Sequence, residues 1–122
     1  MWTYAQLTGR LMAADGEVEG VGYSGSPFAK NSPSAQNVHN VGPIPEGHYT
    51  IGAPVDTVTH GPYVLPLTPD PANQMFGRSG FLIHGDSIVN PGSASEGCII
   101  MARGVREQIW ESNDHDLEVV HG

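Results

Sequence analysis

The chain has 122 residues, a formal net charge of −8 and a single cysteine. Five lysines and arginines are too few to form the basic patch of a nucleic-acid-binding protein, and they disfavour binding to an anionic membrane surface. One cysteine excludes an intramolecular disulfide. The length is that of one domain, and 16 glycines with 10 prolines favour short strands and turns over long helices.

The first part of the chain predicts paired strands followed by a long loop. Asp15-Gly16 is a tight-turn dipeptide, and residues 17–23 alternate between apolar and polar or small side chains, as a half-buried strand does. Residues 24–42 are rich in Ser, Asn, Pro and Gly and have few apolar anchors. We therefore expect a hairpin that starts the sheet, then a loop whose length is typical of a functional segment.

The second part of the chain predicts further short strands and one helix. Residues 103–112 place Val105, Ile109 and Trp110 on one helical face. Pro66 cannot donate a hydrogen bond, which indicates that its strand lies at an edge or ends there, and we expect a loop over residues 68–78. The chain thus predicts one mainly β domain over residues 1–122, with strands expected at 48–51, 63–67, 81–85, 98–101 and 117–120.

Cys98 and His84 are the candidate catalytic pair. A lone cysteine before an apolar run is either a small buried residue or a nucleophile, and a nucleophile needs a base, access to substrate and donors for the oxyanion. His84 ends an apolar strand and precedes Gly85, which leaves the ring uncovered. Gly97 allows a tight turn before the thiol, so the amides of Gly97 and Cys98 are candidate oxyanion donors. A cationic imidazole beside the thiol would favour the thiolate.

Ordered sequence blocks carry a family resemblance. The segments around His84 and Cys98 resemble the His-Gly and Ser-x-Gly-Cys signature of L,D-transpeptidases, and the upstream blocks extend the match from about residue 2 to about residue 101. The chain is most similar to the type VI secretion L,D-transpeptidase effector (Tlde1-like) domain. The blocks are Gly22-Tyr23-Ser24-Gly25, Gly42-Pro43-Ile44-Pro45-Glu46-Gly47-His48-Tyr49-Thr50-Ile51, Gly77-Arg78-Ser79-Gly80-Phe81, Phe81-Leu82-Ile83-His84-Gly85 and Ser95-Glu96-Gly97-Cys98-Ile99.

The resemblance implies a compact L,D-transpeptidase-like β-sandwich or barrel with one short helix and no cofactor. It implies that Cys98 attacks the carbonyl between meso-diaminopimelate and D-alanine in a peptidoglycan stem, with His84 as base. The acyl-enzyme would pass to water in L,D-carboxypeptidase trimming, to a D-amino acid in exchange, or to a second stem in cross-linking. Gly97 would help to line the oxyanion hole, and Ser95 would hold the turn or a substrate group.

The resemblance also implies an antibacterial effector that acts in the periplasm of a target cell, with a cognate immunity protein as a candidate partner. The N-terminal residues lack the basic start and apolar stretch of a secretory signal peptide, so we expect export by a secretion system. No apolar run approaches the roughly 20 residues that span a bilayer, so we expect no membrane insertion.

Two positions depart from the wider L,D-transpeptidase pattern. Glu96 stands where many members have a histidine, and Ile100 where they have an arginine. The substrate carboxylate then needs another cation, for which Arg78 and Arg103 are the candidates. These departures favour trimming or exchange over cross-linking. Gly85, Arg78 and His60 are the candidate substrate-binding residues.

Several alternatives stay open at the level of the sequence. Asp86, Glu96 or a backbone carbonyl would each orient His84. Six histidines admit a metal-dependent peptidase, although none falls in a short ligand pair and we predict no metal site. An inactive wall-binding module with the same fold is the third reading.

Overall fold

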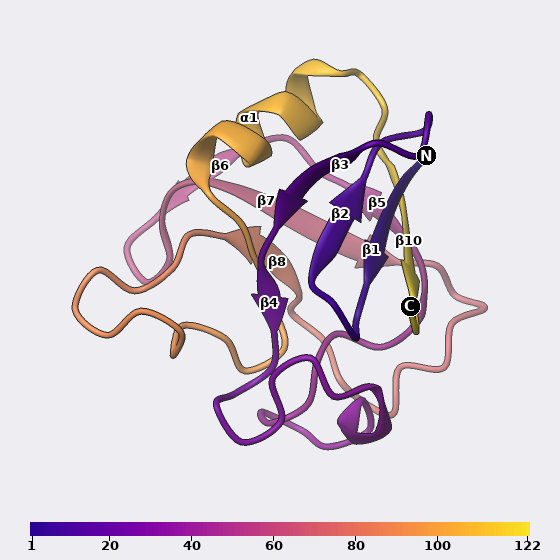
Figure 1. The fold of residues 1–122 in the computed structure, drawn as a ribbon, viewed down its shortest axis with the longest axis vertical. Coiled ribbons are helices and arrows are strands. Elements are labelled where there is room, and N and C mark those ends of the chain that lie inside the picture. The colour runs from indigo at the N-terminus through magenta and orange to yellow at the C-terminus, as the bar shows by residue number, and fades with distance from the viewer.

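The computed structural model describes residues 1–122 and confirms a mainly β chain with one short α-helix (Figure 1). The predicted hairpin, the long loop and the helix are all present. The elements are β1 Trp2–Ala5, β2 Arg10–Met12, β3 Val18–Val21, β4 Tyr23–Ser24, a 3-10 turn Pro33–Ala35, β5 Gly47–Ile51, β6 Val55–Thr57, β7 Gly61–Pro69, β8 Leu82–His84, β9 Ile99–Ile100, α1 Arg103–Glu111 and β10 Asp116–Val120.

All ten strands belong to one sheet in the order β3-β2-β1-β10-β5-β7-β8-β9-β4, with β6 paired to β7 beside this path. The pairs β1–β10 and β8–β9 are parallel. Only Gly22 separates the two edge strands β3 and β4 in the chain, so the sheet curves until its edges meet. A Cβ at Gly22 would lie 1.7 Å from the carbonyl oxygen of Ile100, and only glycine fits this crossing. The more specific L,D-transpeptidase-like sandwich or barrel stays a prediction.

Strand β7 corrects the expectation for Pro66. The strand runs beyond the expected 63–67 in both directions and pairs in turn with β6, β8 and β5. Pro66 therefore lies within the sheet and not at an edge or an end. Its missing N–H is tolerated because the strand changes partners here: Pro66 is paired with Leu82, and its carbonyl accepts the N–H of Gly52 at 2.8 Å. The short, largely exposed β6 was not expected from the sequence.

Helix α1 covers one end of the sheet and packs against β7 and β8 (Figure 1). Its predicted apolar face is confirmed, because Ile109 is fully buried while Val105 and Trp110 pack against the core. A nine-residue helix is marginal in isolation, and no side chain caps its N-terminus at Ala102. The packing of this face therefore stabilises the helix. No helix of the structure has the length and apolar composition needed to cross a membrane.

Candidate active site

A pocket of about 1090 Å³ opens where β8 ends, beside the N-terminus of α1. Only five of its 24 lining residues are hydrophobic, so it suits a polar ligand. Of the residues that the sequence singled out for the site, all but Ser95 line this pocket. They are His60, Arg78, His84, Gly85, Gly97 and Cys98.

The strand register places Cys98 and His84 on one face of the sheet. Strands β8 and β9 are parallel, with His84 opposite Ile100. Cys98 precedes β9 and is two residues before Ile100, so it lies opposite Leu82. Side chains two residues apart along a strand share a face. The thiol and the imidazole therefore project to the same side, into the pocket that both line.

The thiol of Cys98 rests against backbone groups. Its Sγ donates to the carbonyl oxygen of Gly80 at 3.9 Å and not to His84. Burial raises the pKa of this thiol, Glu96 raises it further, and the N–H of Leu82 and the guanidinium of Arg78 lower it. The net pKa is above the ordinary value, so the thiol is protonated at neutral pH. Attack on a carbonyl therefore needs a base.

His84 is held as a neutral base with one ring nitrogen free. Its Nδ1 lies 2.8 Å from the carbonyl oxygen of Gly85, and because a carbonyl only accepts, Nδ1 carries the proton. In the neutral ring Nε2 then has the lone pair. Burial lowers the pKa of His84, with smaller lowering by His60 and Arg106, so the ring is neutral at pH 7. The His60 ring centre is 4.6 Å away. Of the orienting groups that the sequence left open, the structure has a backbone carbonyl in place.

Ser95 fixes the turn that carries the cysteine. Its Oγ accepts the N–H groups of Gly25 and Gly97, each at 3.0 Å, and donates to the carbonyl oxygen of Cys98 at 2.6 Å. The neighbouring Ser24 hydroxyl donates to the carbonyl oxygen of Gly97 at 2.8 Å. Three of these hydrogen bonds hold the backbone of Gly97 and Cys98, and the fourth ties Ser95 to Gly25.

These bonds distinguish the two predicted oxyanion donors. The N–H of Gly97 is engaged by Ser95, whereas the N–H of Cys98 has no acceptor within the chain. The Cys98 amide is therefore the donor that is free for a ligand. An oxyanion hole needs such a donor, pointed at the oxygen on which negative charge develops when a carbonyl is attacked.

Arg78 ties the long loop to this turn. Its Nη1 donates to the carbonyl oxygens of Gln36 and Pro43, and its Nη2 to those of Gly42 and Glu96, at 2.6–3.1 Å. The four terminal N–H groups are thus all engaged by the backbone. The guanidinium is buried without a carboxylate partner, so its cation is balanced by carbonyl dipoles.

Gly97 is required where it stands. Its φ of +144° lies in the region that favours glycine. A Cβ would also lie 2.5 Å from Arg78 Nη2 and 2.9 Å from the ring of Phe81. The close approach of Arg78 to the cysteine turn therefore depends on the missing side chain.

Comparison with known families matches residues 19–121 to the model of the Tlde1 domain. The chain belongs to the Tlde1 domain family. The resemblance read from the sequence blocks is confirmed at this level, and the family is one of type VI secretion effectors. No curated protein and no solved structure matches the chain.

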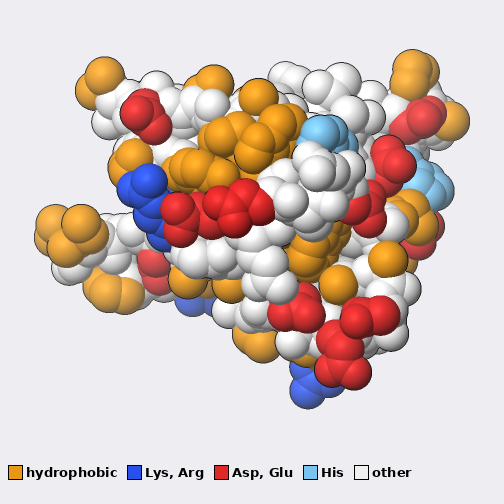
Figure 2. All heavy atoms as spheres, turned by 90° about the horizontal axis from the view of Figure 1, so that it is seen from above, with side chains coloured by type: hydrophobic (Ala, Val, Ile, Leu, Met, Phe, Trp, Pro, Cys, Tyr) orange, Lys and Arg blue, Asp and Glu red, His pale blue; other side chains and the backbone are white.

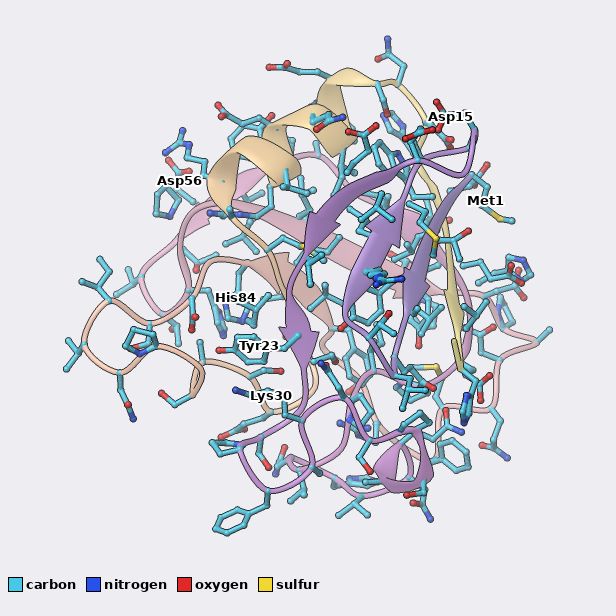
Figure 3. The ribbon with its side chains drawn as sticks, in the orientation of Figure 1. Met1, Asp15, Tyr23, Lys30, Asp56 and His84 are labelled. Atoms are coloured by element: carbon cyan, nitrogen blue, oxygen red, sulfur yellow. The ribbon has the colours of Figure 1, made fainter.

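In this Tlde1 domain, Asp86 holds the loop between His84 and Cys98. Its Oδ1 accepts the hydroxyl of Tyr23 at 2.6 Å and the N–H of Ser87 at 2.8 Å, and both its oxygens accept the N–H of Gly92. These hydrogen bonds lower the pKa of Asp86 despite partial desolvation. Tyr23 lies near His84 in Figure 3, with the ammonium of Lys30 4.4 Å from its ring centre. Asp86 is committed to loop geometry and not to His84.

Arg106 is a pocket residue that the sequence analysis missed. It lies on the buried side of α1, one turn before Ile109, and this spacing was a usable signal. Its Nη1 donates to the carbonyl oxygens of Pro62 at 2.9 Å and Tyr63 at 2.8 Å. Arg103, which the sequence analysis named with Arg78 as a candidate cation, pairs with Glu107 on the helix surface at 3.8 Å.

The six histidines do not converge in this Tlde1 domain. No group of three or more His, Cys, Asp or Glu side chains is placed to hold a metal ion. His48 pairs with Glu118 on the surface, and His115 stacks on Trp110. Only His39, His60 and His84 line the pocket.

Proposed function

We propose that the protein is a cysteine L,D-carboxypeptidase of peptidoglycan tetrapeptide stems, with D-amino-acid exchange as a second outcome of the same acyl-enzyme. The observation that carries the proposal is the state of His84. It is a neutral imidazole with Nδ1–H bound to a carbonyl and Nε2 free, in the same pocket and on the same sheet face as the only thiol. A protonated thiol becomes a nucleophile when a neutral base removes its proton, and the pocket holds one of each.

The first half-reaction follows from these groups. The thiol rotates away from Gly80, His84 Nε2 takes its proton, and Sγ attacks the carbonyl carbon between meso-diaminopimelate and D-alanine. The N–H of Cys98 donates to the oxyanion. His84 then returns the proton to the leaving nitrogen as the C–N bond breaks, D-alanine departs as the free amino acid, and a thioester remains on Cys98.

The second half-reaction uses the same histidine. His84 removes a proton from water as its oxygen attacks the thioester carbonyl, and the C–S bond breaks with return of the proton to Cys98. The product is a tripeptide stem. A D-amino acid amine in place of water gives exchange, which is the first half-reaction run backwards. The polar pocket and the fixed cysteine turn support this scheme. As part of the same proposal, we infer that the curved sheet is an L,D-transpeptidase-type sandwich or barrel.

Purified muropeptides and mass spectrometry test the proposal. We expect loss of one D-alanine from tetrapeptides with the wild-type protein and none with Cys98→Ala. His84→Ala should lower the rate by about 100-fold or more, the usual contribution of a general base. His48→Ala is the matched control because His48 is exposed on β5. Activity that survives Cys98→Ala but is lost in chelator would replace this proposal with a metal peptidase. An inactive wall-binding module would leave the tetrapeptide unchanged and bind it.

We further propose that the site of action is the periplasm of a rival cell and that an immunity protein protects the producer. Belonging to an effector family supports this, and the substrate lies outside the cytoplasm. Expression with a periplasmic signal should arrest a susceptible bacterium, whereas Cys98→Ala should not. Equal toxicity of the cytoplasmic form would contradict the assignment.

A further inference from the structure

Basic residues outnumber acidic ones in the lining of the pocket, whereas the whole protein is strongly acidic. Three of the five basic residues line it, namely Arg78, Arg103 and Arg106, but only two of the 13 acidic residues, Asp86 and Glu96. Elsewhere acidic side chains prevail, and Figure 2 shows them spread over the face seen from above. Both carboxylate oxygens of Asp86 already accept hydrogen bonds. A cleft lined with cations in an acidic protein concentrates the field where an anionic ligand would bind.

Arg106 is the cation with unused donors. Its side chain is only 5% exposed, yet only its Nη1 has hydrogen-bond acceptors. Its Nε is buried and has no partner. Its Nη2 also lacks an acceptor and lies beside Gly85, where a Cβ would approach to 3.1 Å. A buried guanidinium without a carboxylate is costly, and an anionic ligand would relieve that cost.

The backbone fixes the direction of this guanidinium. Tyr63 has a φ of +54°, which is unusual for a bulky residue. In this conformation its carbonyl and that of Pro62 both accept from the same nitrogen of Arg106. Nη1 is thereby anchored, and Nη2 remains for a ligand, whereas the unpartnered Nε is buried behind it. The arrangement holds the arginine ready before any substrate arrives.

We propose that Arg106 binds the C-terminal carboxylate of the stem peptide that is cleaved. This inference rests on the proposed function. His84 must protonate the leaving nitrogen, so D-alanine lies on the His84 side of the scissile carbonyl. Its carboxylate is attached to the carbon that bears this nitrogen, and so it falls just beyond His84. Gly85 and Arg106 Nη2 occupy that place, on the side away from Cys98, which lies opposite Leu82.

The same placement assigns the acceptor in exchange. Exchange is cleavage in reverse, so the incoming D-amino acid binds where D-alanine left, with its carboxylate on Arg106. Arg78 does not compete for this role because its four terminal N–H groups already donate to carbonyl oxygens. Arg103 is half exposed and paired with Glu107. The missing family arginine at position 100 is thus replaced from the helix.

A pair of substrates tests the inference with the wild-type protein alone. One tetrapeptide stem ends in D-alanine and the other in D-alaninamide, and kcat/KM is measured for release of the last residue. We expect the amide to react about 10- to 100-fold more slowly, which is the loss of one charge-assisted hydrogen-bond pair. A third stem, amidated only on the diaminopimelate side-chain carboxyl, should react like the first. Equal rates for acid and amide, or a loss confined to the third stem, would overturn the assignment.

Variants then locate the carboxylate site. In Arg106→Gln the ratio of acid to amide rates should fall to about 1, while Arg10→Gln, which removes the same charge from an exposed position of β2 outside the pocket, should keep the wild-type ratio. If Arg106→Gln does not fold, Gly85→Ala provides the second measurement, because its methyl crowds Nη2 and leaves the bonds of Nη1 intact. A wild-type ratio in the folded variant contradicts the role of Arg106. Failure of the wild type to trim any stem would instead contradict the proposed function.

Discussion

Arg78 and Arg106 are both buried, both lack a carboxylate partner and both line the pocket, yet their hydrogen bonds differ. Arg78 donates from Nη1 and Nη2 to four backbone carbonyls and so joins the long loop to the cysteine turn. Arg106 donates from Nη1 alone. A buried arginine whose terminal N–H groups all have acceptors stabilises the fold. One that keeps N–H groups without acceptors can still bind a ligand. The predictions below test this difference.

The largest expected effect is on stability at Arg78. Arg78→Met should lower the free energy of unfolding by about 3–5 kcal/mol, because it leaves several carbonyl groups without a donor. Arg106→Met should cost about 1–3 kcal/mol, since only two carbonyls lose their donor and a poorly satisfied charge is removed. Urea unfolding followed by circular dichroism measures both. Equal losses would remove the distinction between the two arginines.

Replacing the glycine beside each arginine tests the same difference, at Gly97 for Arg78 and at Gly85 for Arg106. Gly97→Ala should destabilise the protein by about 2–3 kcal/mol, because its backbone conformation disfavours a side chain and the methyl would overlap Arg78. Gly85→Ala should cost less than about 1 kcal/mol, since its Cβ would lie 3.1 Å from Arg106 Nη2, which has no hydrogen-bond partner to lose in a small shift. Thermal unfolding compares the two variants. A Gly85→Ala loss as large as that of Gly97→Ala would show that Arg106 is as rigidly required as Arg78.

The smallest effect is a shift in pH dependence. Because burial holds the pKa of His84 below its ordinary value of 6.5, the neutral base persists below that pH, and the rate of Cys98 alkylation should fall only at lower pH. In His84→Ala the rate should instead rise mainly at alkaline pH, since the pKa of the thiol is raised. Iodoacetamide labelling from pH 4 to 10 gives both profiles. Superimposable profiles would exclude His84 as the base of Cys98.

Much of the local structure could be predicted because it depends on neighbours in the chain. The turn at Asp15-Gly16, the strand that ends at His84 and the helical spacing of Ile109 are signals of this kind, and the structure has all three elements. The sequence also suggested a backbone carbonyl among the groups that orient His84, but it could not select Gly85. That choice depends on the ring orientation in the folded protein.

Non-local pairing explains what was missed. Pro66 was expected at an edge or an end because the sequence does not show that β7 changes partners at that residue. Arg106 was overlooked when Arg78 and Arg103 were named as candidate cations, although an arginine one turn before a buried isoleucine lies on the inner side of a helix. Its use depends on the carbonyls of Pro62 and Tyr63, which come from a strand more than 40 residues earlier.

The position of β10 has a consequence for biosynthesis. This strand is the last of the ten in sequence order, yet it lies in the interior of the sheet, parallel to β1 and antiparallel to β5. Until residues 116–120 leave the ribosome, β1 and β5 each expose an unpaired edge and the sheet remains in two parts. The nascent chain therefore cannot complete its sheet before its final strand emerges.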